Sequence, residues 1–178
     1  MALRKGHCGT ARERSFTRKS RLRGKNYIKA VPPSKISKFI MGDSKSYFDK
    51  KYEFVISLTS NQEIQLRDQA LEATRQLLLR HLNEEVKNFC LMLKTQPHHI
   101  IREHKQAAVA QADRIFQGMS GAWGKPSLLA AQVKKNAKVF SIAVGKDKLK
   151  EAHEILAMAK AKLPGKYTII EEKIDDLL

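Results

Sequence analysis

Residues 52–82 read YEFVISLTSNQEIQLRDQALEATRQLLLRHL, and this stretch decides the class of fold. Alternate residues are apolar at its start, which predicts a half-buried β-strand over residues 52–58. Ser60 and Glu63 then have the spacing of a capping box, so we expect an amphipathic helix from there to about residue 82. The apolar positions on one side of that helix are Leu66, Ala70, Leu71, Ala73, Leu77, Leu78 and Leu82.

The flanking segments predict more short strands. Residues 35–40 begin with alternating polar and apolar side chains, so we expect a strand there, followed by a turn at 41–44. Further along, an extended stretch is expected at 100–101 after Pro97, and a basic turn at 134–136. Apolar runs of strand length occupy residues 89–93, 130–133, 139–144 and 167–170.

A second helix has the most regular spacing in the chain. Its apolar residues recur at intervals of three, four, three and four, and Pro164-Gly165 ends it. These positions are Leu149, Ala152, Leu156, Ala159 and Leu163. Two helices interleaved with about six mostly antiparallel strands predict an α+β sandwich, with a sheet on one side and helices on the other. The acidic end, with Glu171, Glu172, Asp175 and Asp176, is expected to be a solvated tail.

The first 38 residues form a basic, extended segment. They contain twelve Lys or Arg and one acid, Glu13, and thus hold most of the formal net charge of +16. Packed like charges repel, whereas RNA phosphates would neutralise them with release of counterions. We therefore expect a basic RNA-binding arm over 1–33, a globular rRNA-binding domain over 34–173 and an acidic tail over 174–178. The residues expected to bind RNA are Arg4, Lys5, Arg12, Arg14, Arg18, Lys19, Arg21, Arg23, Lys25 and Lys29 in the arm, with Lys35, Lys125, Lys134 and Lys135 in the domain.

Composition argues against a membrane or secreted protein. No run of eighteen apolar residues is present, and residues 1–5 open no apolar signal region, so neither a transmembrane helix nor a secretory signal is expected. Between residues 11 and 24 only Phe16 and Leu22 are strongly apolar, too few to bury a stripe in lipid. Cys8 and Cys90 are not expected to form a disulfide, which fits a reducing, cytoplasmic compartment. Cys90 is interpreted as a small buried hydrophobe.

No residue pattern in the chain predicts catalysis, a metal or a cofactor. His98 and His99 are adjacent, so on a strand their side chains point to opposite faces and cannot both bind one ion without distortion. The glycines of residues 118–124 lack the spacing of a phosphate-binding loop. We expect the histidines to face RNA or to close a sheet edge. Trp123 either stacks on a base or packs in the core or an interface.

Several short motifs resemble those of one known family, and they occur in the same order along nearly the whole chain. They include His98-His99-Ile100-Ile101-Arg102-Glu103, Ala112-Asp113-Arg114, Gly118-Met119 and Gly124-Lys125-Pro126, together with Thr17-Arg18, Tyr27-Ile28, Met41-Gly42, Gln65-Leu66-Arg67 and Lys162-Leu163-Pro164. The chain resembles the universal large-subunit ribosomal protein family, called L-sixteen in bacteria and L-ten-e in archaea and eukaryotes. Its Met-Ala-Leu-Arg start and its length resemble the archaeal and eukaryotic type.

The resemblance implies a cytoplasmic structural protein of the large ribosomal subunit that is neither an enzyme nor a homo-oligomer. Its partners would be large-subunit rRNA near the peptidyl-transferase centre, aminoacyl-tRNA, which it would help to position, and neighbouring ribosomal proteins. A loop at about 105–118 would face the tRNA through His104, Lys105, Gln106 and Arg114.

That loop differs from the family pattern at two positions. Val109 and Gln111 stand where the family usually has glycine, so we expect residues 106–117 to be more helical than in relatives. Two alternatives to the ribosomal function are a non-ribosomal RNA- or tRNA-binding factor and an RNA-modifying enzyme with a basic arm. The enzyme would need a cofactor or metal constellation.

Overall fold

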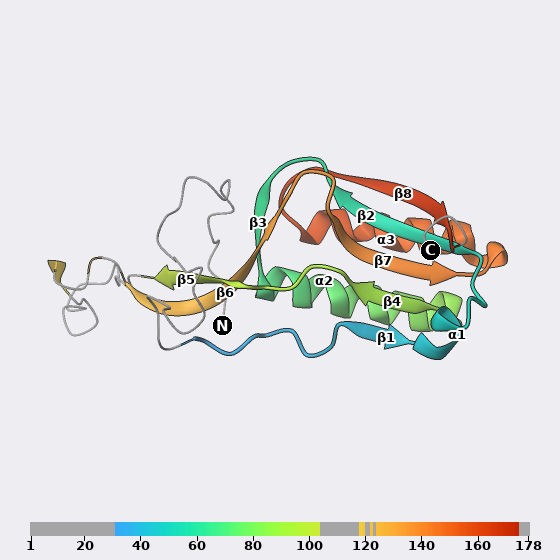
Figure 1. The fold of residues 1–178 in the computed structure, drawn as a ribbon, viewed down its shortest axis with the longest axis horizontal. Coiled ribbons are helices and arrows are strands. Elements are labelled where there is room, and N and C mark those ends of the chain that lie inside the picture. Colours follow the sequence, from blue (N-terminus) through green and yellow to red (C-terminus); the bar gives the residue numbers. More distant parts are fainter. Residues whose placement is uncertain (1–30, 104–117, 120–121, 123, 175–178) are drawn as a thin grey trace.

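The computed structural model describes residues 31–103, 118, 119, 122 and 124–174. Within them, eight strands form two antiparallel sheets that pack with two main helices (Figure 1), so the predicted α+β class is confirmed. The larger sheet has the order β1 (Ile40–Gly42), β4 (Cys90–Leu93), β7 (Lys138–Val144), β2 (Phe54–Ser60) and β8 (Tyr167–Lys173). The smaller sheet has the order β3 (Ile64–Arg67), β6 (Lys125–Val133) and β5 (His99–Glu103). The helices are α1 (Ser44–Phe48), α2 (Asp68–His81), the π-helical turn η2 (Leu82–Val86), the 3-10 turn η5 (Lys146–Lys148) and α3 (Leu149–Lys162).

The main core lies between the larger sheet and the two long helices. Figure 1 shows α2 and α3 side by side behind this sheet. Alternate residues of β2 and β7, among them Ile56 and Ile142, pack against Leu78 of α2 and Leu156 of α3, and all four are fully buried. Burial of each such side chain stabilises the fold by roughly 1.5–3 kcal/mol. The helical spacing found in the sequence is thus the spacing of the buried face.

The opposite face of the larger sheet carries a second, smaller cluster of buried residues. Cys90 is fully buried there among Val55, Met92 and Ala143, which confirms its interpretation as a small hydrophobe. Burial raises the pKa of the Cys90 thiol, because the thiolate is poorly solvated there. Besides these residues, this face carries several hydroxyl groups and the ion pair of Lys138 with Glu172.

Two of these hydroxyl groups satisfy each other. Ser57 of β2 lies opposite Ser141 of β7, and their Oγ atoms are 2.9 Å apart in a fully buried position. Ser57→Ala is expected to lower the free energy of unfolding by about 1–3 kcal/mol, since it leaves the Ser141 hydroxyl without its partner. The double variant with Ser141→Ala should recover part of that loss, because neither unpaired hydroxyl remains. Urea unfolding of the two single variants and the double variant measures the coupling, and strictly additive losses would contradict the pairing.

The two sheets meet at a corner built from two adjacent chain turns. The chain passes from β2 into β3 at residues 61–63 and from β6 into β7 at residues 134–137. The amide of Ser60 donates to the carbonyl of Ala137 at 3.0 Å, and the amide of Asn136 donates to the carbonyl of Ser60 at 2.7 Å. Beyond this corner the β5–β6 hairpin extends away from the helices (Figure 1), with Ile100 and Leu129 as its own small buried cluster.

The predicted helix start at Ser60 is wrong. Residues 64–67 form β3, and α2 begins only at Asp68. The Ser60 hydroxyl donates to the carbonyl of Gln62 at 2.7 Å instead of capping a helix. Ile64–Arg67 pair with residues 130–133 of β6, so long-range pairing with a distant strand overrides the local capping pattern.

The predicted strand at 35–40 and turn at 41–44 are also displaced. The strand covers only Ile40–Gly42, and α1 follows with Asp43 accepting a bond from the Ser46 amide at 3.1 Å. The amides of Lys35 and Ser37 bond to carboxylates of α2, so this segment has no ladder of its own. Side chains of a helix therefore replace a neighbouring strand as its partner.

Two further expectations differ from the structure. The sequence predicted a single sheet of about six strands, whereas the described residues form one sheet of five strands and one of three. The chain turns a corner after β2 and before β7, and this corner separates the two sheets. Strand β8 continues to Lys173, so Glu171 and Glu172 belong to a paired strand and not to a tail.

The strand at 89–93, the turn at 134–136 and the helix from Leu149 are confirmed within a residue or two. The arm up to residue 30, the expected helix at 106–117, Trp123, Asp175 and Asp176 lie outside the described residues. Among the helices described, none has the length and apolar character needed to cross a bilayer.

Candidate nucleic-acid interface

Four of the predicted RNA-binding residues fall in the described part of the chain. Lys35, Lys125, Lys134 and Lys135 are all exposed, and they occupy three separate places. Lys35 precedes β1 beside α2, Lys125 begins β6 at the outer end of the hairpin, and Lys134 with Lys135 forms the β6–β7 turn. The ten predicted arm residues from Arg4 to Lys29, and the loop residues His104, Lys105, Gln106 and Arg114, lie outside the described residues.

The segment on which Lys35 lies is bound to one face of α2. The Lys35 amide donates to Asp68 Oδ2 at 3.1 Å, and the Ser37 amide and hydroxyl each donate to the Glu72 carboxylate at 3.4 Å. Ile36 between them is buried in the main core. Residues 35–37 are therefore held by two carboxylates and one apolar contact while the Lys35 side chain stays exposed.

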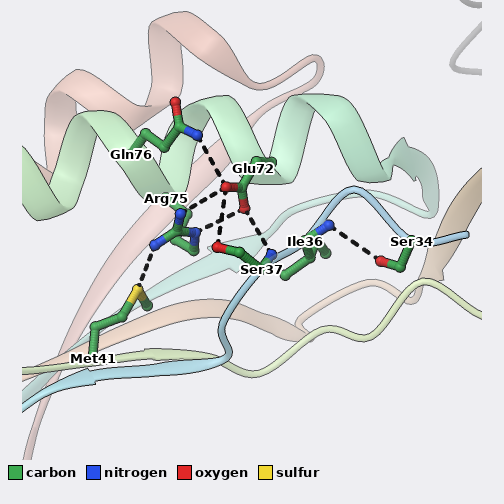
Figure 2. A network of polar contacts seen from close by, with 7 residues as sticks. All are labelled: Ser34, Ile36, Ser37, Met41, Glu72, Arg75 and Gln76. Carbon is green, nitrogen blue, oxygen red and sulfur yellow. Dashed lines mark hydrogen bonds and ion pairs between the residues drawn. The ribbon is translucent and has the colours of Figure 1, made fainter.

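Glu72 is itself held by Arg75, which is buried, and Figure 2 shows the contacts between them. Arg75 donates from Nε to Glu72 Oε2 at 2.8 Å and from Nη2 to Glu72 Oε1 at 2.6 Å, a two-point ion pair. Its remaining Nη1 lies 3.0 Å from Met41 Sδ in β1, and Gln76 donates to Glu72 at 3.0 Å. The cluster thus connects helix α2, residue 37 and strand β1.

The pKa values of the two carboxylates that hold residues 35–37 are shifted in opposite directions. The hydrogen bond from Arg75 lowers the pKa of Glu72, so this carboxylate is charged at neutral pH. Burial raises the pKa of Asp68, although bonds from the Lys35 and Gln69 amides favour its charged form. Sequence reasoning missed Asp68, Glu72 and Arg75. The only local signal was an acid and a base three residues apart on a helix, which is usually a surface pair.

The β5–β6 hairpin positions the ends of the predicted tRNA-facing loop. Glu103 pairs with Lys125 in register, so the chain leaves β5 and enters β6 at the outer end of the hairpin. Near this end, the Arg102 Nε and Ser127 Oγ atoms are buried without a hydrogen-bond partner in the structure. Such groups are costly unless a ligand or water completes their bonding.

The histidines lie at the inner end of the same hairpin. His98 is exposed, with Nδ1 3.1 Å from the carbonyl of Gln96, and His99 begins β5, an edge strand of the smaller sheet. Their rings meet edge to face with centroids 6.3 Å apart. Across the described residues, no three His, Cys, Asp or Glu side chains come together as a metal site would require.

The fold and its surface define the class of protein first. A basic α+β domain that presents lysines at turns and hairpin ends has the electrostatic features of an RNA-binding protein. The family model described as Ribosomal protein L16p/L10e matches residues 12–170. The chain belongs to this family, and the predicted resemblance is confirmed.

Curated relatives cover nearly the whole chain. Large ribosomal subunit protein uL16 of Archaeoglobus fulgidus is 36% identical over 168 residues, which cover 93% of this chain and 91% of the relative. The protein of the same name from Metallosphaera sedula is 40% identical over 168 residues, with 92% and 91% covered. That of Methanococcus maripaludis is 35% identical over 181 residues, with 100% and 99% covered.

Family membership also decides between the alternatives. The family consists of structural ribosomal components and not enzymes, so the prediction of a non-catalytic protein is confirmed and an RNA-modifying enzyme is set aside. The three relatives are archaeal, in agreement with the type expected from the start and length of the chain.

Proposed function

We propose that this protein is a cytoplasmic structural constituent of the large ribosomal subunit, where it binds large-subunit rRNA near the peptidyl-transferase centre and helps to position aminoacyl-tRNA. The observation that carries the proposal is the family match over residues 12–170, with relatives named as large ribosomal subunit proteins. Its partners are then rRNA, aminoacyl-tRNA and neighbouring ribosomal proteins. Its contribution to peptide transfer is positional, because orienting a reactant is itself a source of rate enhancement.

The attachment of residues 35–37 to α2 supports separate roles for the arm and the domain. Residues 1–33 act as an RNA-binding arm, residues 34–173 as the rRNA-binding domain, and the acidic tail starts at about residue 174. Asp68 and Glu72 hold residues 35–37 against α2, so the domain fixes where the arm begins. Ile174 is still buried, and its amide donates to the carbonyl of Glu53 at 3.1 Å, so the domain includes one residue more than predicted and the tail follows it.

The β5–β6 hairpin supports the tRNA part of the proposal. It extends away from the helices (Figure 1), and the segment between its strands starts and ends at its outer end. A hairpin that carries a loop away from the body of the domain is suited to reach a neighbouring binding site. In this proposal His104, Lys105, Gln106 and Arg114 face the tRNA, and Lys125 contacts rRNA beside them.

Neutralising the arm tests the rRNA part of the proposal. A variant that combines Arg18→Ala, Arg21→Ala and Arg23→Ala is expected to incorporate poorly into large subunits, because three charges no longer meet phosphates. The plot of log binding constant against log salt should become shallower by about 0.7–0.9 per lost phosphate contact. Sucrose gradients over a series of salt concentrations and binding to large-subunit rRNA measure both effects.

A matched variant controls for net charge. Lys45, Lys50 and Lys146 are exposed lysines of the domain, and changing all three to Ala removes the same charge. It is expected to retain most incorporation. Equal salt slopes for wild type and the arm variant would remove the arm from the mechanism. Loss of the wild-type protein from subunits at moderate salt would favour a non-ribosomal RNA-binding factor instead.

A further inference from the structure

Three chain turns that are distant in sequence meet where the larger sheet passes into the smaller one. They are residues 60–63, 134–137 and 163–166, which we call the three-turn corner together with the adjoining last residues of α3, 160–162. Besides the bonds from Ser60 to the β6–β7 turn, the Asn61 amide donates to the carbonyl of Lys166 at 3.0 Å. These bonds join the three turns, because residues 60 and 61 bond to the turn on each side.

The backbone of this corner is held in place by further contacts. The Thr168 hydroxyl donates to Asn61 Oδ1 at 2.8 Å, and the Tyr167 hydroxyl donates to the carbonyl of Pro164 at 2.7 Å. Gly165 has a φ of +98°, and a Cβ there would lie 2.8 Å from Ile64 Cδ1. The positive φ favours glycine at this position, because other residues adopt it only with strain. The charged side chains of the corner therefore project from a fixed frame.

The charge of the corner is strongly one-sided. Its segments contain five lysines and a single acid, Glu63, and all six side chains are exposed. None of the five forms an ion pair in the described structure, whereas Lys138 and Lys148 elsewhere pair with Glu172 and Glu151. The lysines are Lys134, Lys135, Lys160, Lys162 and Lys166.

Helix stability accounts for only part of this cluster. Lys160 and Lys162 lie in the last turn of α3, where positive charge favours the exposed carbonyls of a helix end. Lys134, Lys135 and Lys166 are on other segments and gain nothing from that helix. Like charges brought together on a fixed frame, without acids, are expected where a polyanion neutralises them.

We infer that the three-turn corner is a second RNA-binding surface, independent of the arm, that takes the sugar–phosphate backbone of an rRNA helix. The inference rests on the proposed function and adds Lys160, Lys162 and Lys166 to the expected contacts. The corner presents no exposed aromatic side chain among its described residues, since Tyr167 is buried. Lysines without a stacking partner contact phosphates and do not read bases.

The test compares two full-length variants with the same change in charge. The corner variant carries Lys134→Gln, Lys135→Gln, Lys162→Gln and Lys166→Gln. The control variant carries Lys45→Gln, Lys50→Gln, Lys146→Gln and Lys150→Gln, all exposed lysines in or next to α1 and η5, at the opposite end of the larger sheet. The probe is protein-free large-subunit rRNA transcribed in vitro, and the readout is the slope of log binding constant against log salt.

The corner variant is expected to shift the slope towards zero by about three, at 0.7–0.9 per lost contact, and the control variant by less than one such step. A corner variant with four Lys→Arg changes should restore the wild-type slope. The corner and arm effects should add when combined. Unchanged thermal unfolding shows that the corner variant is folded, as expected for side chains without partners.

Equal slopes for the corner and control variants would overturn the inference, because general electrostatics would then explain both. Sedimentation of the wild-type protein separates this result from failure of the proposed function. If the wild type stays with large subunits while the corner variant keeps its slope, only the corner inference fails. If the wild type leaves the subunits, the proposed function fails, and the slopes on free rRNA still decide whether the corner binds RNA.

Discussion

Glu72→Gln is expected to lower the free energy of unfolding by about 3 kcal/mol at neutral pH. The variant keeps the size of the side chain but leaves the Arg75 guanidinium without its anion. The side chain of Arg75 is only 8% exposed and that of Glu72 only 14%, so water cannot take the place of the lost carboxylate. Removing one partner of a buried ion pair costs far more than the pair contributes, because an uncompensated charge stays buried. Urea unfolding monitored by circular dichroism measures the change.

A second ion pair of the same protein supplies the control. Arg80 and Glu84 are four residues apart with side chains 78% and 55% exposed. Glu84→Gln is expected to change the stability by less than about 0.5 kcal/mol, since exposed pairs are screened by water. The double variant Glu72→Gln with Arg75→Met should be more stable than Glu72→Gln alone, because the buried charge of Arg75 is then no longer left without its partner. If Glu72→Gln and Glu84→Gln lowered the free energy of unfolding equally, the buried pair would contribute no more to stability than the exposed one.

The pH dependence of stability provides an independent check. Arg75 lowers the pKa of Glu72 below its ordinary value of 4.5. The stabilisation from this carboxylate is therefore complete above that value and is lost as the pH falls through the lower native pKa. Asp68 acts with the opposite sign because burial raises its pKa. Both the wild type and Glu72→Gln retain Asp68. The wild type should therefore lose more unfolding free energy than the variant as the pH falls, and this difference measures the contribution of Glu72.

This cluster also connects stability to the proposed function. Glu72 accepts bonds from Ser37 while Arg75 contacts Met41, so the same ion pair holds residues 37–41 against α2. An arm that orders on RNA needs a fixed starting point on the domain if its ordering is to orient the domain. We expect Glu72→Gln to weaken the attachment of residues 37–41 to α2. The β5–β6 hairpin should be less affected, because it does not contact this ion pair.

Local patterns were sufficient to predict the parts of the fold that depend on local contacts. The spacing of Leu149, Ala152 and Leu156 predicted α3, because a helix places such residues on one face whatever their partners. The β6–β7 turn was predicted from three polar residues, and Asn136 there takes a φ of +63°. The family was predicted from several short motifs that occur in the same order along the chain, although each motif alone is a weak signal.

The remaining features depend on partners far apart in the chain. The sequence has a capping pattern at Ser60, yet Ile64–Arg67 pair with residues 130–133 of β6, which lie more than sixty positions further along the chain. The contacts of Ser37 with Glu72 and of Asn61 with Lys166 are likewise long-range. Of the five lysines of the three-turn corner, only Lys134 and Lys135 were predicted to bind RNA, and they are adjacent in sequence. Lys166 joins them through tertiary structure alone.

Gly42→Ala is expected to destabilise the protein by about 3–5 kcal/mol, at the upper end of single substitutions. Gly42 ends β1 with a φ of +84°, a conformation that costs other residues about 1–2 kcal/mol. An added Cβ would also lie 2.2 Å from the carbonyl oxygen of Phe89, which is backbone and cannot rotate away. That oxygen accepts the amide of Asp43 at 2.9 Å, so moving it breaks a bond and separates β1 from β4.

Gly145→Ala is the matched control for the same chemical change. Gly145 has a φ of −76°, and a Cβ there would meet no atom within 4 Å. This substitution is expected to leave stability unchanged or to raise it by about 0.4–1 kcal/mol, because it restricts the unfolded chain. Urea unfolding of both variants measures the difference. If Gly42→Ala were no worse than Gly145→Ala, β1 would have to shift away from Phe89 at little cost. The contact of Met41 with Arg75 would then be dispensable for the position of the edge strand.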